Sequence, residues 1–415
     1  MRAIAQKASG GLVRSVGSGL EYLAAWTLSW FEDDSQSARR WRELALRYSH
    51  MGVPLLDRMS LERSIAASPR DIEPRVELGM LLLERGDLEQ ARKAFEGALS
   101  CEYSHKGAVR GMATTLHRMG KLSEAAYFYL SYLSEEPEDA EVLVNLGIVL
   151  DAQGEFELAI ERFRKALELK PDSAAVHILL ARALMRTGNL GEARHVLSRA
   201  VDLDPRNSEA HRFLGHVAQN LGEKAEAERL FEKAIECDEN NPHAYLNLSQ
   251  LLNMDERDPN RTVPLARSAR EIFHTQGDQH GLAFSLWEIG WAEYLRGNWK
   301  ESAEASAQAL ENEPELLPVR FNRALALLRG GDSQGAEREY ARTLEGSVDV
   351  SALRTHGIAD LRKALKEDPQ IAGGEALLHH MEERDRQLER EILERAAATR
   401  SEQAMSTIPG PSRTE

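Results

Sequence analysis

The stretch that decides the fold is residues 140–173, AEVLVNLGIVLDAQGEFELAIERFRKALELKPDS. Its first half places three leucines on one helical face, and Gly154 then breaks the helix. Its second half carries apolar residues at intervals of three and four until Pro171 ends a second helix. Neither helix can bury its apolar face alone. The stretch therefore predicts a helix–turn–helix unit that needs neighbours of the same kind.

Those neighbours recur along the chain at one constant interval. The turn glycine stands at Gly52, Gly86, Gly120, Gly154, Gly188 and Gly222, and again at Gly297 and Gly331. A small residue early in the second helix recurs in register at Ala91, Ala125, Ala159, Ala193, Ala227 and Ala336. A bulky residue follows four positions later at Phe95, Tyr129, Phe163, Leu197, Phe231 and Tyr340. A terminal proline recurs at Pro69, Pro137, Pro171, Pro205 and Pro314.

A helix–turn–helix period of about 34 residues with these slots resembles the tetratricopeptide repeat (TPR) family. The resemblance covers roughly three quarters of the chain. It implies an all-α fold, a right-handed superhelical solenoid of helix–turn–helix repeats with helical caps. The residue types agree with this packing, because glycine permits positive φ at the turn and alanine lets two helices approach closely.

The repeat register divides the chain into seven predicted regions. These are 1–37, an N-terminal amphipathic or capping helix; 38–71, a degenerate repeat; 72–241, five regular repeats; 242–282, an irregular longer repeat; 283–350, two further repeats; 351–400, a partial repeat and a charged C-terminal helix; and 401–415, a disordered tail. In the irregular repeat, a long turn and an extended second helix, Val263 to Thr275, would change the superhelical pitch or act as a hinge. The charged C-terminal helix is expected to cap the solenoid, with a short coiled coil as the alternative.

The N-terminal segment has three possible interpretations. Residues 1–20 carry no acidic residue, and aromatic residues including Trp30 and Phe31 follow them. The segment could cap the first repeat, lie as an amphipathic helix on a membrane surface through residues 1–31, or be a cleaved signal or transit peptide. A secretory signal is disfavoured because Arg14 and Glu21 interrupt the apolar run. The sequence contains no run of about 18 apolar residues, so no membrane-spanning helix is predicted.

Charge and motifs limit the classes of function. The net charge of −15 disfavours nucleic-acid binding through overall charge. Cys101 and Cys237 lie far apart, so no disulfide framework is expected. A cytoplasmic protein is predicted, with a peripheral location at a membrane as the alternative. No glycine-rich phosphate loop, GxSxG, HExxH or CxxC motif occurs. We therefore predict a non-enzymatic protein with no cofactor and no metal.

The first candidate site is a basic strip. In the resembled family the first helix of each repeat lines a concave groove, and partner segments bind there. The corresponding positions of this chain include Arg110, His117, Arg118, Arg182, Arg186, Arg212 and His216. Such a strip suits an acidic segment or a C-terminal carboxylate. The alternative is an ordinary solvated charged face, on which some of these arginines pair with glutamates within or between repeats.

The second candidate site is aromatic. Phe284, Trp287, Trp291 and Tyr294 share one stripe of a first helix, and Phe321 joins them from the next repeat. Because tryptophan and tyrosine are frequent interface anchors, the stripe predicts partner contact in the groove. Burial beneath another helix of this chain is the alternative.

Together these features predict a protein–protein interaction scaffold or adaptor that binds a partner peptide or helix in the concave groove. Two alternatives remain at this point. One is a membrane-surface-associated assembly factor tethered by the N-terminal amphipathic helix, and the other is a peptide-sensing regulatory protein.

Overall fold

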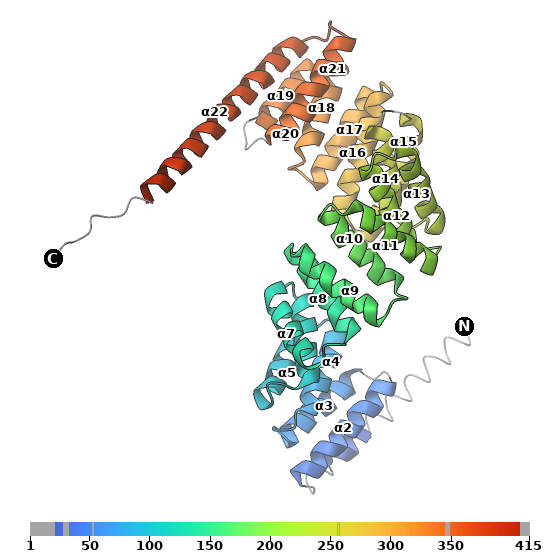
Figure 1. Ribbon diagram of the computed structural model, residues 1–415, viewed down its shortest axis with the longest axis vertical. Helices are drawn as coiled ribbons and strands as arrows, with labels where there is room; N and C mark the ends of the chain where they lie inside the picture. Colours follow the sequence, from blue (N-terminus) through green and yellow to red (C-terminus); the bar gives the residue numbers. More distant parts are fainter. Residues whose placement is uncertain are drawn as a thin grey trace, which may run out of the picture. The chain divides into compact units, whose positions relative to one another are not determined.

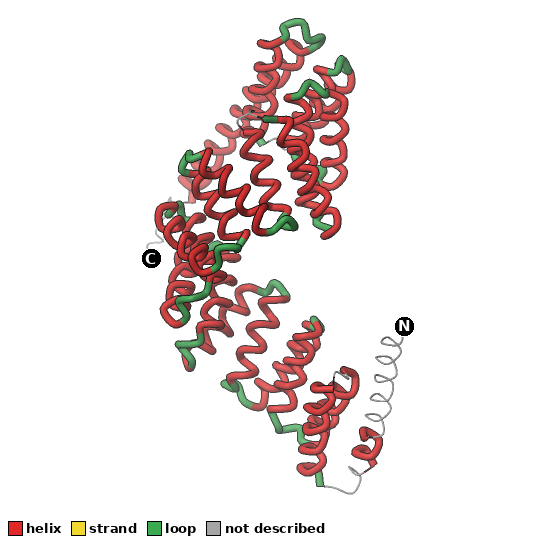
Figure 2. The backbone as a smooth tube through the Cα atoms, turned by 90° about the vertical axis from the view of Figure 1, so that its right-hand side faces the viewer, coloured by secondary structure: helices red, strands yellow, loops and turns green. Residues whose placement is uncertain are grey.

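The computed structural model describes residues 21–27, 33–51, 54–254, 256, 258–344 and 349–406, with side chains as far as residue 394. Every regular element in these ranges is a helix, and no strand occurs among them (Figures 1 and 2). The chain divides into two compact units, residues 1–204 and 205–415, called here unit 1 and unit 2. Each unit is described by itself below.

The described part of unit 1 contains five helix pairs. The first and second helices of each are α2 (Asp34–Met51) and α3 (Pro54–Ala67), α4 (Glu73–Arg85) and α5 (Leu88–Cys101), α6 (Lys106–Arg118) and α7 (Leu122–Glu135), α8 (Ala140–Gln153) and α9 (Phe156–Leu169), and α10 (Ala174–Arg186) and α11 (Leu190–Leu203).

Unit 2 contains four more pairs and a C-terminal group of helices. The pairs are α12 (Ser208–Asn220) and α13 (Lys224–Cys237), α14 (Pro242–Met254) and α15 (Pro259–Gln276), α16 (Gln279–Leu295) and α17 (Trp299–Asn312), and α18 (Leu317–Arg329) and α19 (Ser333–Leu344). The C-terminal group is α20 (Val350–Ala352), the π-helical turn η1 (Leu353–Ile358), α21 (Ala359–Glu367) and α22 (Gly374–Ser406).

The pairs stack in the same way throughout each unit. A second helix packs against its own first helix and against the first helix of the next repeat, as α9 does with α8 and α10. Successive first helices also contact one another, for example α14 with α16 and α16 with α18. This nearest-neighbour stacking confirms the predicted all-α repeat solenoid (Figure 1). The face formed by the first helices of a unit is called its first-helix face.

The predicted slots are occupied as expected. The turn glycines have φ between 74° and 87° at Gly86, Gly120, Gly154, Gly188, Gly222, Gly297 and Gly331. Gly52 lies outside the described residues. The six small alanines of the second helices are fully buried, and the bulky residues four positions later are buried too.

Four predicted region boundaries fall inside helices. The boundary after residue 350 lies within α20 (Val350–Ala352), and the boundary after residue 400 lies within α22, so residues 401–406 of the predicted disordered tail are helical. The boundary after residue 37 lies within α2, which begins at Asp34. The boundary after residue 282 lies within α16, which begins at Gln279, because a further glycine turn at Gly277 (φ 72°) ends α15. The extra residues of the irregular repeat thus lengthen both α15 and α16.

The ends of the chain pack against their neighbouring repeats where the structure describes them. Tyr22 and Ala25 are buried, and the Tyr22 ring lies 5.0 Å from the Trp41 ring of α2. Trp30 and Phe31 lie outside the described residues. At the other end, Met381 of α22 is fully buried against unit 2. None of the described helices is long and apolar enough to cross a membrane.

Candidate functional site

Two of the four arginines in the predicted basic strip of unit 1 pair with carboxylates of the same chain. Arg182 Nη2 donates to Asp151 Oδ2 at 2.8 Å, from α10 to the neighbouring first helix α8. Arg110 Nη2 lies 2.9 Å from Glu141 Oε1, again on the neighbouring first helix. Arg110 and Arg182 therefore follow the alternative interpretation, in which these arginines pair between repeats.

The other basic residues of unit 1 also contact their own chain. Arg118 donates to the carbonyl oxygen of Leu83 on α4. The Arg186 guanidinium lies over the Phe156 ring, 5.9 Å from its centroid. His117 is half-buried, and burial lowers the pKa of its imidazole, which favours the neutral ring. These contacts weaken the case for an acidic partner on this unit.

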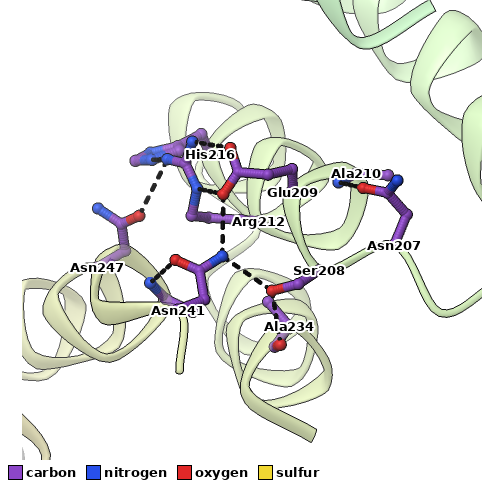
Figure 3. Close-up of polar contacts among 10 residues, drawn as sticks. Asn207, Ser208, Glu209, Ala210, Arg212, His216, Ala234, Asn241 and Asn247 are labelled. Atoms are coloured by element: carbon purple, nitrogen blue, oxygen red, sulfur yellow. Dashed lines mark hydrogen bonds and ion pairs between the residues drawn. The ribbon is translucent and has the colours of Figure 1, made fainter. Parts of the chain in front are cut away.

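Arg212 and His216 belong to a polar network on α12 and α14 of unit 2 (Figure 3). Arg212 donates to both oxygens of Glu209, at 2.9 Å from Nε and 2.6 Å from Nη2. Glu209 also accepts from Asn241 Nδ2 at 2.9 Å. Burial raises the pKa of Glu209, but the hydrogen bonds from Arg212 and Asn241 outweigh it, so the pKa falls below its ordinary value.

His216 completes this network as a neutral ring. Arg212 Nη1 lies 3.3 Å from His216 Nε2, and a guanidinium can only donate. Burial, together with the nearby Arg212 charge, lowers the pKa of His216 to about 4. The network therefore joins two neighbouring first helices and leaves little positive charge for a partner.

The predicted aromatic stripe divides into exposed and buried members. Phe321 is fully buried, between the Tyr340 ring at 6.1 Å and the backbone of Gly357, so the prediction that it faces a partner is wrong. Tyr294 is 8% exposed and stacks on Trp291 with ring centroids 5.1 Å apart. Burial raises the pKa of Tyr294 to about 12. Tyr294 therefore packs against Trp291 instead of facing a partner.

Phe284, Trp287 and Trp291 remain partly exposed on α16. Phe284 lies at one end of the stripe, beside the His280 ring at 4.7 Å. Trp287 and Trp291 line a pocket of about 360 Å³ on the first-helix face of unit 2. The remaining lining residues come from α12, α14, the turn after α14, α16, α18, η1 and α21: Gln219, Gln250, Asn253, Met254, Glu256, Glu288, Asn322, Thr355, His356 and Asp360.

The walls of this pocket are aromatic and acidic. The His356 ring meets Trp287 edge to face, with centroids 6.0 Å apart. Burial raises the pKa of Glu288 to about 7, although hydrogen bonds from Asn253 and Gln250 oppose the shift. Burial also raises the pKa of Asp360 to about 7, against the pull of Lys363. Both carboxyl groups therefore titrate near neutral pH.

Two buried amides on the pocket wall have unpaired oxygens. Asn253 Nδ2 donates to Glu288 Oε2 at 2.7 Å and to the Glu288 carbonyl oxygen at 3.0 Å. Asn253 Oδ1 then has no hydrogen-bond partner among the described residues, and neither has Asn322 Oδ1. Their residues are 4% and 3% exposed, and buried acceptors usually find a donor. The wall of this pocket therefore presents two buried acceptors that a ligand with N–H or O–H donors would satisfy.

Sequence reasoning missed the polar half of this pocket, yet a signal was present. Glu288 of α16, Asn322 of α18 and His356 of η1 follow one another at the interval of the repeat. Gln219 and Asn253 are also one repeat interval apart. A polar residue that recurs in the repeat register marks a shared position on neighbouring helices, so these residues could have been grouped before the structure was known.

Comparison with family models follows the repeat register. Models described as tetratricopeptide repeat match residues 76–140, 150–217, 208–241 and 287–349, which together make up more than half of the chain. The chain belongs to the tetratricopeptide repeat family. Repeats of this kind form extended surfaces for protein partners, and the chain is a protein–protein interaction scaffold in this general sense. Proteins of the family are generally non-enzymatic.

Solved structures resemble this TPR protein in fold. A tetratricopeptide repeat protein from Parabacteroides merdae is 19% identical and matches with a TM-score of 0.51, over 60% of this chain and 99% of that one. YrrB, a TPR protein with an unusual peptide-binding site, is 22% identical over 44% and 95% of the two chains, with a TM-score of 0.41. MamA from Desulfovibrio magneticus is 23% identical over 40% and 95%, with a TM-score of 0.40. No curated protein matches the sequence.

Proposed function

We propose that this TPR protein binds a segment of a partner protein on the first-helix face of unit 2, with one partner side chain held in the pocket beside Trp287 and Trp291. The observation that carries the proposal is the pair of partly exposed tryptophans in a pocket of about 360 Å³. Tryptophans in desolvated pockets are typical energetic centres of protein interfaces. The pocket volume suits one anchoring side chain and its backbone rather than a folded domain.

A second pocket of unit 2 supports this choice by contrast. It has a volume of about 660 Å³ and lies between α15, α16 and α17. Its described lining includes no Trp, Tyr or Phe, and charged side chains such as Arg270 and Glu271 are prominent. This larger pocket therefore lacks the anchors that typify an interface centre, and the smaller pocket is the better candidate.

Affinity capture from native cell extract tests the proposal. The intact protein is compared with a Trp287→Ala/Trp291→Ala variant, with Thr355→Trp, and with Arg182→Ala/Arg186→Ala in unit 1. Thr355 is exposed and lines the pocket, so a tryptophan there fills the pocket without removing a core side chain. We expect the two pocket variants to lose a partner that the unit 1 variant retains. Retention of the partner by either pocket variant, with unchanged helical circular dichroism, would refute the proposal.

A further inference from the structure

The pocket on the first-helix face of unit 2 has a one-sided set of charges. Three carboxyl groups line it, those of Glu256, Glu288 and Asp360. Among the lining residues that the structure describes, none is Lys or Arg. Lys363 of α21 pairs with Glu256 at the edge of the pocket. A ligand that enters the pocket therefore meets three carboxyl groups, of which Glu256 already pairs with Lys363, and no Lys or Arg among the described lining residues.

The uncharged groups of the pocket favour the same class of ligand. Asn253 Oδ1 and Asn322 Oδ1 lack partners among the described residues, and both side chains are more than nine-tenths buried in the pocket wall. Such acceptors are matched by a ligand that brings several N–H donors. Trp287 and Trp291 add aromatic side chains, whose ring faces attract cations.

Arginine satisfies these conditions better than lysine does. Its guanidinium carries five N–H donors in a planar fork and no acceptor. It stacks on aromatic faces, pairs with a carboxylate through two hydrogen bonds, and is less strongly hydrated than an ammonium group. The pocket combines partners for each of these properties, since Trp287 and Asp360 line the same volume of about 360 Å³.

We propose that this pocket binds the guanidinium of an arginine side chain from an extended partner segment, with the tryptophans against its plane and Asp360 as its carboxylate partner. The proposal rests on the proposed function and specifies the chemistry of the anchor. It also replaces the acidic partner predicted from the basic strip, because three of the five arginines of that strip, Arg110, Arg182 and Arg212, form ion pairs with carboxylates of the same chain.

A titration of the full-length protein with short peptides tests this chemistry. The probes are acetyl-Gly-Ser-X-Ser-Gly-amide peptides in which X is arginine, citrulline or glutamate, and tryptophan fluorescence and calorimetry report binding. Citrulline keeps the shape of arginine and removes the charge. We expect the arginine peptide to bind at least about tenfold more tightly than the citrulline peptide. Equal affinities, tighter binding of the glutamate peptide, or no arginine-peptide binding up to about 10 mM would overturn the proposal.

Two charge-removing variants locate the bound peptide. Asp360→Asn alters the pocket, whereas Glu337→Gln removes an exposed carboxylate of α19 outside it. We expect Asp360→Asn to weaken arginine-peptide binding about tenfold and Glu337→Gln to leave it unchanged. Equal effects of the two variants would overturn the proposal.

Failure of the arginine proposal can be distinguished from failure of the proposed function. If Thr355→Trp abolishes partner capture while the arginine peptide shows no preference, the pocket is the partner site but its anchor is not arginine. If Thr355→Trp leaves partner capture intact, the proposed function itself fails, and the peptide titration then has no bearing on it.

Discussion

At the scale of single residues, the repeats are fixed by aromatic rings that pack on glycines within the first helices. A Cβ atom added at Gly147 would lie 2.5 Å from the Phe163 ring, which is fully buried. Gly215 stands in the same relation to Phe231, again at 2.5 Å. These glycines have ordinary helical backbones, and their function is to admit the ring. Their role differs from that of the turn glycines, which adopt positive φ.

We predict that Gly147→Ala destabilises unit 1 by about 1–3 kcal/mol, because the buried ring has no space into which to move. The matched control is Gly191→Ala on α11, where an added Cβ meets nothing within 4 Å. That substitution should stabilise the protein by up to about 1 kcal/mol through helix propensity. Urea denaturation measures both changes in the free energy of unfolding. Equal changes would show that contact with the Phe163 ring is not what destabilises Gly147→Ala.

The buried carboxyl of Glu288 makes the stability of unit 2 depend on pH. Burial raises its pKa from 4.5 to about 7, so the folded state binds the proton more tightly than the unfolded state does. Its protonated form therefore stabilises the fold below about pH 4.5, and that stabilisation is lost as the pH rises to 7. At about 1.4 kcal/mol per pKa unit, the loss is about 3 kcal/mol.

We predict that Glu288→Gln removes this part of the pH dependence. Urea midpoints measured between pH 5 and pH 8 should fall less steeply for the variant than for the native chain. All histidines and Asp360 are shared by the two proteins, so their contributions cancel in the difference to a first approximation. A difference that does not change with pH would contradict the assigned pKa of Glu288.

At the scale of elements, the C-terminal helix α22 serves as a cover for the end of unit 2. Met381 is fully buried in the same cluster as Leu361 and Phe321. Arg354 of η1 donates to Asp385 at 2.8 Å, and Arg362 of α21 donates to Glu382 at 2.7 Å. These contacts favour capping over the coiled-coil alternative, because α22 packs its buried side chains against its own chain.

We predict that Met381→Ala lowers the stability of unit 2 by about 2–5 kcal/mol through the cavity that it leaves. Ile392→Ala on the same helix removes a side chain that is 53% exposed, and it should cost less than about 0.5 kcal/mol. Thermal denaturation followed by circular dichroism distinguishes the two. A large effect of Ile392→Ala would instead indicate a partner helix on the outer side of α22.

The elements also show what the sequence could predict. The repeat register predicted the helix pairs, the turn glycines and the buried alanine slots, since these depend only on contacts within a repeat and with its neighbour. Phe321 was placed wrongly because Gly357 and Tyr340 cover it, and the register did not predict how residues 350–367 pack. For Arg182 the sequence allowed two interpretations, and the structure shows the one in which it pairs across repeats, with Asp151.

At the scale of the whole molecule, the acidic composition and the acidic pocket both favour a basic partner. The chain carries 67 Asp and Glu against 52 Lys and Arg, a net charge of −15. A negative molecule attracts a basic partner over distances that salt shortens. The Debye length falls from about 30 Å at 0.01 M salt to about 8 Å at 0.15 M. Long-range attraction should therefore add to the recognition of an arginine-containing segment.

We predict that the arginine peptide binds several-fold more weakly at 0.15 M than at 0.01 M salt. The citrulline peptide, which carries no charge at that position, should show no such dependence. Fluorescence titrations at the two salt concentrations make the comparison. The same salt dependence of affinity for both peptides would mean that the charge of the protein does not contribute to binding.

The most direct test of the central claim, that the partner binds at the pocket of unit 2, is site-specific photo-crosslinking in cells. A benzophenone amino acid replaces Met254, which lines the pocket and is 72% exposed. As a control it replaces Lys300 on the second helix α17, whose side chain is 84% exposed. The account predicts a crosslinked partner from position 254 and none from position 300, with the position 254 product lost on adding Thr355→Trp. A product from position 300 alone, or a position 254 product that survives Thr355→Trp, would contradict it.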